Sequence, residues 1–332
     1  MKNFCEENNL AQKLPHTHTH THTHTHTIIT ILIFFTVLFN FSACSFTWND
    51  GIKDWFEKAM LRARPKATRI DSNWIQISAG TFQMGSSASE GKVHTVTLTH
   101  AFYISDHEVT QSEYEKYCKY LNDIPNNTWG KGEDYPVYYV AWYDAVVYCN
   151  LRSIAEGFVP CYKIGGESDP TKWTDIKSDN APSTTKYCAP DNCDWNIICD
   201  WNANGYRLPT EAEWECATRG KIKNTGINVW AGTTNEDELS DYAWYKTNST
   251  SKTHEVKQKK PNGYGLYDMS GNVYEWCCVA GKINTLNDGD CPTRGGSFSG
   301  DEISHLDVGK PSYNTMNHRS NDLGFRFVRT VQ

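Results

Sequence analysis

Two carboxylates flank a tight turn in the sequence GLYDMSGNVYEW and could hold a metal ion. Asp268 and Glu275 stand on either side of Gly271. Calcium takes about six to eight oxygen ligands, from carboxylates and backbone carbonyls together, and this turn supplies about four of them. An Asp-capped turn, with Glu275 hydrogen-bonded to the backbone, explains the same residues without an ion. Structural calcium is therefore one of two alternatives here.

Ser297, His305 and His318 are residue types of a hydrolase, but their setting does not favour one. Ser297 lies in a Gly-Gly-Ser-Phe turn, not in the G-x-S-x-G turn that exposes a catalytic serine. A histidine base also needs a carboxylate that orients it, and the sequence does not give that geometry for either histidine. We therefore interpret both histidines as contact residues.

The segment Ser299–Asp322 is a polar mixture without a sustained period of about 2 or 3.6 residues. Such a segment is typical of surface loops that bind a ligand. Three side chains could act as rigid anchors, namely Phe298, Tyr313 and His318. Adaptable hydrogen bonds are expected from Ser299, Asp301, His305, Asp307, Asn314, Asn317, Asn321 and Asp322.

Regular elements elsewhere in the chain must position these residues. Thr110–Asn122 predicts a helix, because Thr110 and Glu113 form a capping-box pattern. Val140–Gly157 and Pro209–Gly220 predict two more helices, each ended by its glycine. Trp74–Thr99 alternates and contains glycines, which favours a pair of strands.

Three glutamates in the last of these helices could be mistaken for an acid–base cluster. Glu211, Glu213 and Glu215 point in different directions on a helix. We therefore expect structural hydrogen bonds and solvated charge from them.

Ten of the 12 cysteines follow Cys44, an even number that permits disulfides in an exported domain. Cys188, Cys193 and Cys199, with Cys161 upstream, lack the paired C-x-x-C spacing of a zinc knuckle. The sequence favours disulfides or free buried thiols over zinc, and it does not decide between the first two.

Several motifs in order resemble the sulfatase-modifying-factor domain family, which includes the formylglycine-generating enzymes. They are ISAGTFQMGS from Ile77, YRLPTEAEWECATRG from Tyr206, NGYGLYDMSGNVYEW from Asn262 and RGGSF from Arg294. The resemblance runs from about Trp74 to Arg329. It implies an α+β, C-type-lectin-like fold that is rich in loops, with small antiparallel sheets and a few helices. It also implies structural calcium at Asp268, Gly271, Val273 and Glu275.

Active members of this family bind copper through two cysteines that follow the Gly-Gly-Ser turn and oxidise a substrate cysteine. The cysteines stand three and eight residues beyond the serine, where this chain has Gly300 and His305 after Ser297. Cys291, the last cysteine, precedes the turn. Cu(I) is soft and selects thiolate ligands, so we expect no copper and no catalysis. Copper-dependent cysteine oxidation is the alternative function.

The chain is also similar to the variable proteins of diversity-generating retroelements, a subgroup whose C-terminal segment is rewritten at template adenines. RGGSF and LGFRFVR stand where that subgroup has fixed blocks. Substitution at adenines of Asn codons gives the residue types found at Ser299, Gly300, Asp301, His305 and Tyr313. The resemblance predicts a variable ligand-binding region at about 271–329, in a protein that binds a macromolecule, either protein or glycan.

The charge balance argues against nucleic acid as a partner. The formal net charge is -7 over 332 residues, whereas phosphate binding needs clustered Lys and Arg. The 12 Trp and 18 Tyr residues favour a loop-rich domain held together by amphipathic rings.

The N-terminus resembles a bacterial lipoprotein leader. A His-Thr repeat at His16–Thr27 precedes an apolar run of 14 residues, Ile28–Phe41, and then Ser-Ala before Cys44. That run has the length of a signal peptide and is short for a transmembrane helix. We expect lipidation at Cys44 and display on the outer surface of the envelope, with an uncleaved membrane anchor as the alternative.

Three regions follow from these patterns. Residues 1–43 are the repeat and signal peptide, 44–73 are a spacer with a short amphipathic helix, and 74–332 are the C-type-lectin-like domain.

Overall fold

The computed structural model describes residues 55, 58–59, 63–69, 72–87, 93–121, 125–178, 186–190, 196–222, 229–278, 290–300 and 303–331. The predicted lipidation site Cys44, the predicted contact Asp301 and most of the predicted spacer helix lie outside these residues. Residues 58–332 form one structural unit, and its elements carry the candidate site.

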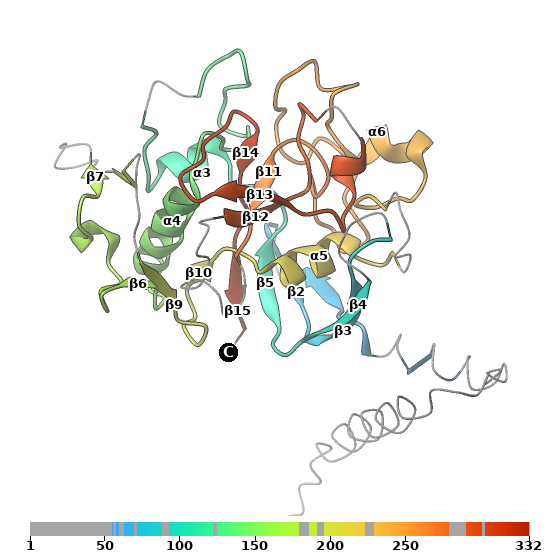
Figure 1. Ribbon diagram of the computed structural model, residues 1–332, viewed down its shortest axis with the longest axis horizontal. Coiled ribbons are helices and arrows are strands. Elements are labelled where there is room, and N and C mark those ends of the chain that lie inside the picture. Colours follow the sequence, from blue (N-terminus) through green and yellow to red (C-terminus); the bar gives the residue numbers. More distant parts are fainter. Residues whose placement is uncertain are drawn as a thin grey trace, which may run out of the picture. The chain divides into compact units, whose positions relative to one another are not determined.

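A five-stranded antiparallel sheet joins segments from both ends of this unit (Figure 1). Its strands, in spatial order, are β1 (Ala67–Arg69), β2 (Trp74–Ile77), β5 (Phe102–Ser105), β15 (Val328–Thr330) and β10 (Tyr206–Arg207). Ile75, Ile104 and Val328 form one row across three strands, and all three are fully buried. The apolar row fixes the register, because a slip of one residue would expose it.

The predicted spacer contributes a strand to this sheet. β1 pairs with β2, with Thr68 opposite Gln76. Backbone pairing in this sheet thus begins at Ala67, before the domain boundary predicted at residue 74.

A second sheet of four strands carries the C-terminal segment. Its spatial order is β13 (Ser312–Thr315), β12 (Asp290–Arg294), β11 (Tyr274–Trp276) and β14 (Leu323–Gly324). β11 and β14 run parallel, and the other pairs are antiparallel. The segment between β13 and β14 therefore crosses from one edge of the sheet to the other.

Three two-stranded sheets complete the strands of the described residues. They are β3 (Gly80–Met84) with β4 (His94–Leu98), β6 (Tyr162–Ile164) with β9 (Ile197–Cys199), and β7 (Lys177–Ser178) with β8 (Tyr187–Cys188). The predicted strand pair within Trp74–Thr99 is β3 and β4.

Two of the three predicted helices form as expected. α4 (Trp142–Ala155) lies beside β10, and α5 (Glu211–Arg219) lies beside β3 (Figure 1). α5 has the full capping box of Thr210 and Glu213 and ends at Gly220, whose φ is 51°. Short helical turns occur at α6 (Leu239–Tyr242), η1 (Pro170–Lys172), η2 (Glu236–Glu238) and η3 (Ile303–Leu306). None of the described helices is long and apolar enough to span a membrane.

The helix predicted at Thr110–Asn122 is much shorter than expected. Its capping box is present, but α3 covers only Gln111–Glu115. Cys118 forms a bridge with Tyr187, whose carbonyl accepts the backbone N–H of Lys119. Pairing with a distant strand therefore replaces the last helical turns.

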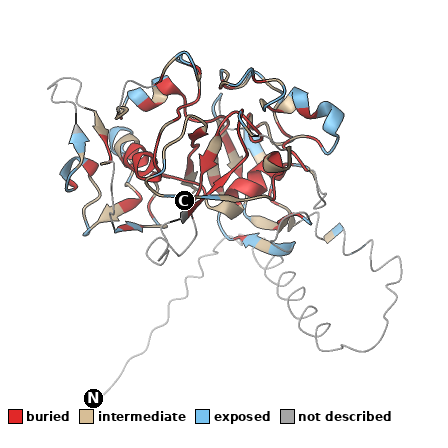
Figure 2. Cartoon of the chain, turned by 45° about the horizontal axis from the view of Figure 1, so that its top comes forward, coloured by how far each residue is buried: buried red, intermediate tan, exposed pale blue. Residues whose placement is uncertain are grey.

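Two apolar clusters lie beneath these elements, in the region that Figure 2 shows as buried. One surrounds α4 and includes Trp276, Phe325 and Phe327. The other surrounds Trp214 of α5 and the row through Ile104. Ten of the 27 buried residues of the first cluster are aromatic.

Candidate ligand-binding surface

A buried ion pair holds the end of the C-terminal segment in place. Arg326 Nε and Nη2 donate to Glu275 Oε2 and Oε1 at 2.7 and 2.8 Å. Trp214 Nε1 of α5 also donates to Glu275 Oε2, at 2.6 Å. Both charged side chains are fully buried, so the loss of either would leave an unpaired buried charge.

Arg294 anchors the start of the same segment to α5. Its Nε donates to Glu211 Oε1 at 3.0 Å, and its Nη1 donates to Glu215 Oε2 at 3.1 Å. Glu215 also accepts from Arg219 Nε at 2.8 Å, and Glu213 pairs with Arg207 at 2.6 Å. The predicted structural hydrogen bonds are therefore confirmed. The predicted solvated charge is wrong for Glu213 and Glu215, which are buried, and Glu211 and Glu215 do not point apart but meet at Arg294.

Asp322 gathers three hydroxyl groups from the two ends of the segment. Ser297 Oγ and Ser299 Oγ donate to Asp322 Oδ2 at 3.0 and 2.7 Å, and Ser320 Oγ donates to Oδ1. The carboxylate is thus engaged within the protein. Of the predicted contacts, Asp322 organises its neighbours, whereas Ser299 beside it is exposed.

Apart from Asp322, seven predicted contacts are exposed or half-exposed, and we call these seven the recognition residues. They are Ser299, His305, Tyr313, Asn314, Asn317, His318 and Asn321. Tyr313 presents the largest apolar surface among them, with 56% of its area exposed. His305 lies on η3, and its carbonyl packs against Gly296. Met316 and Ser320 lie next to recognition residues in the sequence. Their backbone carbonyls accept the N–H groups of Trp142 and Tyr139, respectively.

Phe298 is not the surface anchor that the sequence predicts. Only 1% of the residue is exposed, and its ring lies 6.3 Å from that of Trp129. Its N–H donates to Asn272 O at 2.8 Å, and its carbonyl accepts from Ser249 Oγ at 3.0 Å. The Phe298 ring therefore packs under the loops and is not accessible to a ligand.

Asp307 is also buried and structural, contrary to the prediction, with 3% exposed. Its Oδ1 accepts from Gly309 N at 2.8 Å, and its Oδ2 accepts from Val229 N at 3.2 Å. Since a buried carboxylate needs such partners, the side chain supports the loop and is unavailable to a ligand.

Two neighbouring loops contact the segment and were missed from the sequence. Tyr139 has φ +56° and donates its N–H to Ser320 O at 2.8 Å. Thr250 and Ser251, next to the Ser249 that bonds Phe298, have φ values of +53° and +58°. Positive φ at non-glycine residues is strained and clusters at functional sites. No motif or period in the sequence indicates these positions.

The predicted calcium ligands offer oxygen atoms in a buried setting. Asp268 Oδ1 is buried without a hydrogen-bond partner, and burial raises the pKa of this carboxyl to about 6. Glu275 Oε1 accepts a bond from Arg326, and a carboxylate oxygen has a second lone pair. Within the described residues, no cluster of three or more His, Cys, Asp or Glu could bind a metal. An ion would therefore need the carbonyls of Gly271 and Val273 as well. Arg326 and Trp214 already bind the Glu275 carboxylate, and the calcium site stays a prediction.

The geometry does not support hydrolytic or thiol chemistry in the described part of the chain. Ser297 is fully buried and donates to Asp322. Eight of the described cysteines are buried free thiols, which decides for these eight between the alternatives of disulfide and thiol. Cys291 is also buried, and Cys193 lies outside the described residues. Burial raises the pKa of Cys278 to about 12, so its reactive thiolate is scarce near neutral pH.

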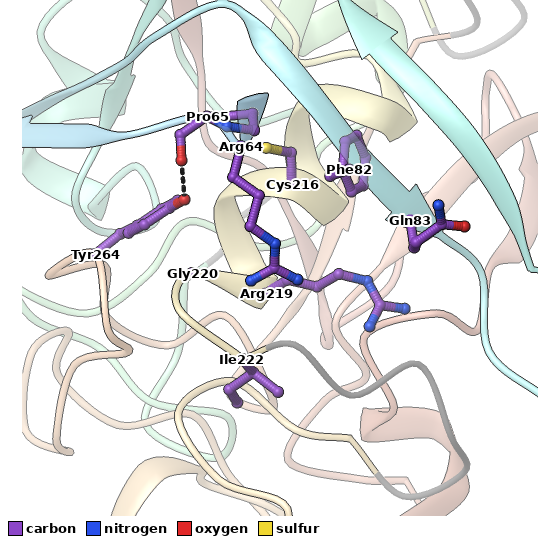
Figure 3. A pocket seen from close by; sticks show the side chains of 9 residues that line it. All are labelled: Arg64, Pro65, Phe82, Gln83, Cys216, Arg219, Gly220, Ile222 and Tyr264. Carbon is purple, nitrogen blue, oxygen red and sulfur yellow. Dashed lines mark hydrogen bonds between the residues drawn. The ribbon is translucent and has the colours of Figure 1, made fainter. Parts of the chain in front are cut away.

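A small hollow lies between β3 and the end of α5, apart from the recognition residues (Figure 3). Two of its polar side chains already have protein partners. The Tyr264 hydroxyl donates to Pro65 O, and Arg219 binds Glu215 and Gly85 O. We assign no ligand to it.

The chain is similar to one protein family over most of its length. The model of the sulfatase-modifying factor enzyme 1-like domain matches residues 60–331. The chaperone protein LppX of Paenibacillus barcinonensis is 38% identical over 228 residues, which are 63% of this chain and 72% of LppX. The formylglycine-generating enzyme of Streptomyces coelicolor is 27% identical over 306 residues, 80% of this chain and 90% of the enzyme.

Among solved structures, variable protein 1 of Treponema denticola is similar in both fold and sequence. It is 34% identical, with a TM-score of 0.63, and the match covers 80% of this chain and 99% of that chain. The likeness confirms the predicted α+β, loop-rich fold of the formylglycine-generating-enzyme type and the predicted resemblance to a variable protein.

Proposed function

The chain belongs to the sulfatase-modifying factor enzyme 1-like domain family, and we propose that it is a non-catalytic, ligand-binding variable protein within that family. The observation that carries this proposal is the replacement of the copper-binding cysteine pair by Gly300 and His305. Neither residue offers a thiolate for Cu(I). The likeness to variable protein 1 of Treponema denticola supports the same function.

The recognition residues would bind the ligand. They are neutral or weakly basic side chains that mix one large aromatic ring with amides, a hydroxyl and imidazoles, as binding loops do. Beneath them, Arg326, Arg294 and Asp322 hold the backbone, so that side chains can vary without loss of the frame. The relative LppX is named a chaperone protein, and a chaperone also acts by binding.

The ligand is a macromolecule, protein or glycan, reached from the bacterial surface. Lipidation at Cys44 would anchor the protein to the envelope, with its recognition residues outward. Fractionation of cells that express the wild type or Cys44→Ser tests the anchor. The wild type should be found in the membrane fraction, and the variant should not. Equal membrane association would contradict lipidation at this cysteine.

A direct assay separates the binding protein from the alternative enzyme. The purified protein is incubated with copper, oxygen and a cysteine-containing sulfatase peptide, and the peptide mass is measured. We expect no conversion of cysteine to aldehyde, while the Streptomyces coelicolor enzyme converts the peptide in parallel. Aldehyde formation by this chain would reject the proposal.

Genomic sequence tests whether the C-terminal segment is diversified. A near-copy of the codons for Gly271–Arg329 should lie close to the gene and differ from it mainly at adenines. If no such copy exists, the protein is a ligand-binding member of the family without diversification.

A further inference from the structure

β13 is an edge strand within the segment that carries the recognition residues. It pairs with β12 on one side, and no other described strand pairs with its second side. Its side chains alternate, since Tyr313 and Thr315 are exposed whereas Ser312 and Asn314 are half-buried.

The register fixes where the backbone groups of Tyr313 point. Tyr313 lies opposite Pro292 of β12. The carbonyl of Pro292 points away from β13 and toward β11, because it accepts the N–H of Cys277 at 2.9 Å. Residues opposite each other in an antiparallel pair either exchange two hydrogen bonds or both point away. The N–H and carbonyl of Tyr313 therefore point out from the free edge.

This edge is only partly protected, since β13 is a short strand that Lys310 and Pro311 precede. Proteins blunt exposed edges with charged residues, prolines or bulges, because unpaired backbone groups bind other strands. The strand Ser312–Thr315 contains neither a charge nor a proline. Tyr313 adds an exposed ring beside its own backbone groups. An edge of this kind is suited to an extended peptide, which supplies the matching donors and acceptors.

We propose that β13 binds an extended segment of a protein ligand as an additional strand of the sheet. The inference rests on the proposed binding function and specifies the ligand as protein. Main-chain hydrogen bonds do not depend on side-chain identity. An edge strand inside a diversified segment would therefore supply affinity that persists while Tyr313, Asn317 or His318 change, and those side chains would select among peptide sequences.

A displayed library of random linear peptides, selected on the folded protein, provides the probe. Tyr313→Ala keeps the outward N–H, whereas Tyr313→Pro removes it, and both remove the ring. Proline is tolerated at an edge where the N–H faces solvent, and thermal unfolding of both variants checks their folding. One lost hydrogen bond predicts roughly tenfold weaker binding of a selected peptide to the proline variant than to the alanine variant.

Amide hydrogen exchange followed by NMR tests the wild type without any substitution. In the free protein, the Asn314 amide should exchange slowly because it faces β12, and the Tyr313 amide should exchange fast. Binding of a selected peptide should slow the exchange of the Tyr313 amide.

Three results would overturn the inference. They are the enrichment of no linear peptide, equal affinities of the alanine and proline variants, and a Tyr313-dependent dimer in which a second copy occupies the edge. A separate result would be that His318→Ala weakens binding of a glycan or peptide while Tyr313→Pro and Tyr313→Ala bind with equal affinity. In that case the proposed binding function stands and only the edge-strand inference fails.

Discussion

Ser299 and Asp322 are 23 residues apart in sequence, and a hydrogen bond of 2.7 Å joins their side chains. The bond closes the C-terminal segment on itself at its two ends. Because Ser297 and Ser320 donate to the same carboxylate, Asp322 orders both flanks of the segment. Such order limits the entropy that a ligand must remove on binding.

Replacement of Asp322 should therefore loosen the segment. We expect Asp322→Ala to lower the free energy of unfolding by about 1–3 kcal/mol, since it deprives three hydroxyls of a charged acceptor. Asp322→Asn keeps one acceptor oxygen and should lose less. Urea denaturation measures both. A loss from Ser299→Ala as large as that from Asp322→Ala would contradict the central role of the carboxylate.

Arg326 should be essential to the fold. Arg326→Gln leaves Glu275 buried and unpaired, and we expect a loss of about 3–5 kcal/mol in the free energy of unfolding. Arg329→Gln is the matched control, because Arg329 is half-exposed and its guanidinium stacks on Tyr103 and Phe158. Chemical denaturation should show a far smaller loss for the control. Equal losses would show that the buried pair contributes little.

Phe298 and Tyr313 should respond in opposite ways to truncation. Phe298→Ala removes a fully buried ring and should cost about 3–5 kcal/mol of stability. Tyr313→Ala removes an exposed ring and should change stability by no more than about 0.5 kcal/mol. Thermal and urea unfolding of the two variants give the comparison. A large stability loss from Tyr313→Ala would show that its ring belongs to the core.

Local sequence signals were reliable where one segment decides its own structure. α5 combines a capping box with a terminal glycine, and both lie within the helix and its neighbours. The predicted length of α3 was wrong because Tyr187, far along the chain, pairs with Cys118 and Lys119. No local pattern reports such pairing.

The candidate site was predicted only in part for a related reason. The absence of a period identified the loops, and the resemblance to the family located their boundaries. Burial within an irregular segment depends on distant partners, such as Trp129 for Phe298 and Val229 for Asp307. The pairing of Glu275 with Arg326 spans 51 residues, and the strained Tyr139 is farther still from the segment in sequence. These contacts required the structure.

His107 should make stability depend on pH. Burial lowers the pKa of this imidazole, but hydrogen bonds to Asp106 and Glu113 outweigh burial and raise the pKa above its ordinary value of 6.5. The folded state thus binds the proton more tightly than the unfolded state. The contribution of His107 to the free energy of unfolding is complete below pH 6.5 and is lost as pH rises through the raised pKa.

We therefore expect the free energy of unfolding to fall across this range in the wild type and to fall less in His107→Gln. Denaturation at a series of pH values measures the slope. His318→Gln, which alters an exposed histidine, should keep the wild-type slope. A His107→Gln profile identical to that of the wild type would show that this histidine does not contribute.

Calcium should stabilise the folded protein through Asp268. Its Oδ1 is buried without a partner, and a cation that binds only the folded state raises the apparent stability. We expect thermal unfolding at a higher temperature in calcium than in EDTA. Asp268→Asn should abolish most of the difference, whereas Asp241→Asn, which alters a carboxylate paired with Lys260 at the surface, should preserve it. Equal unfolding temperatures of the wild type in calcium and in EDTA would favour the turn without an ion.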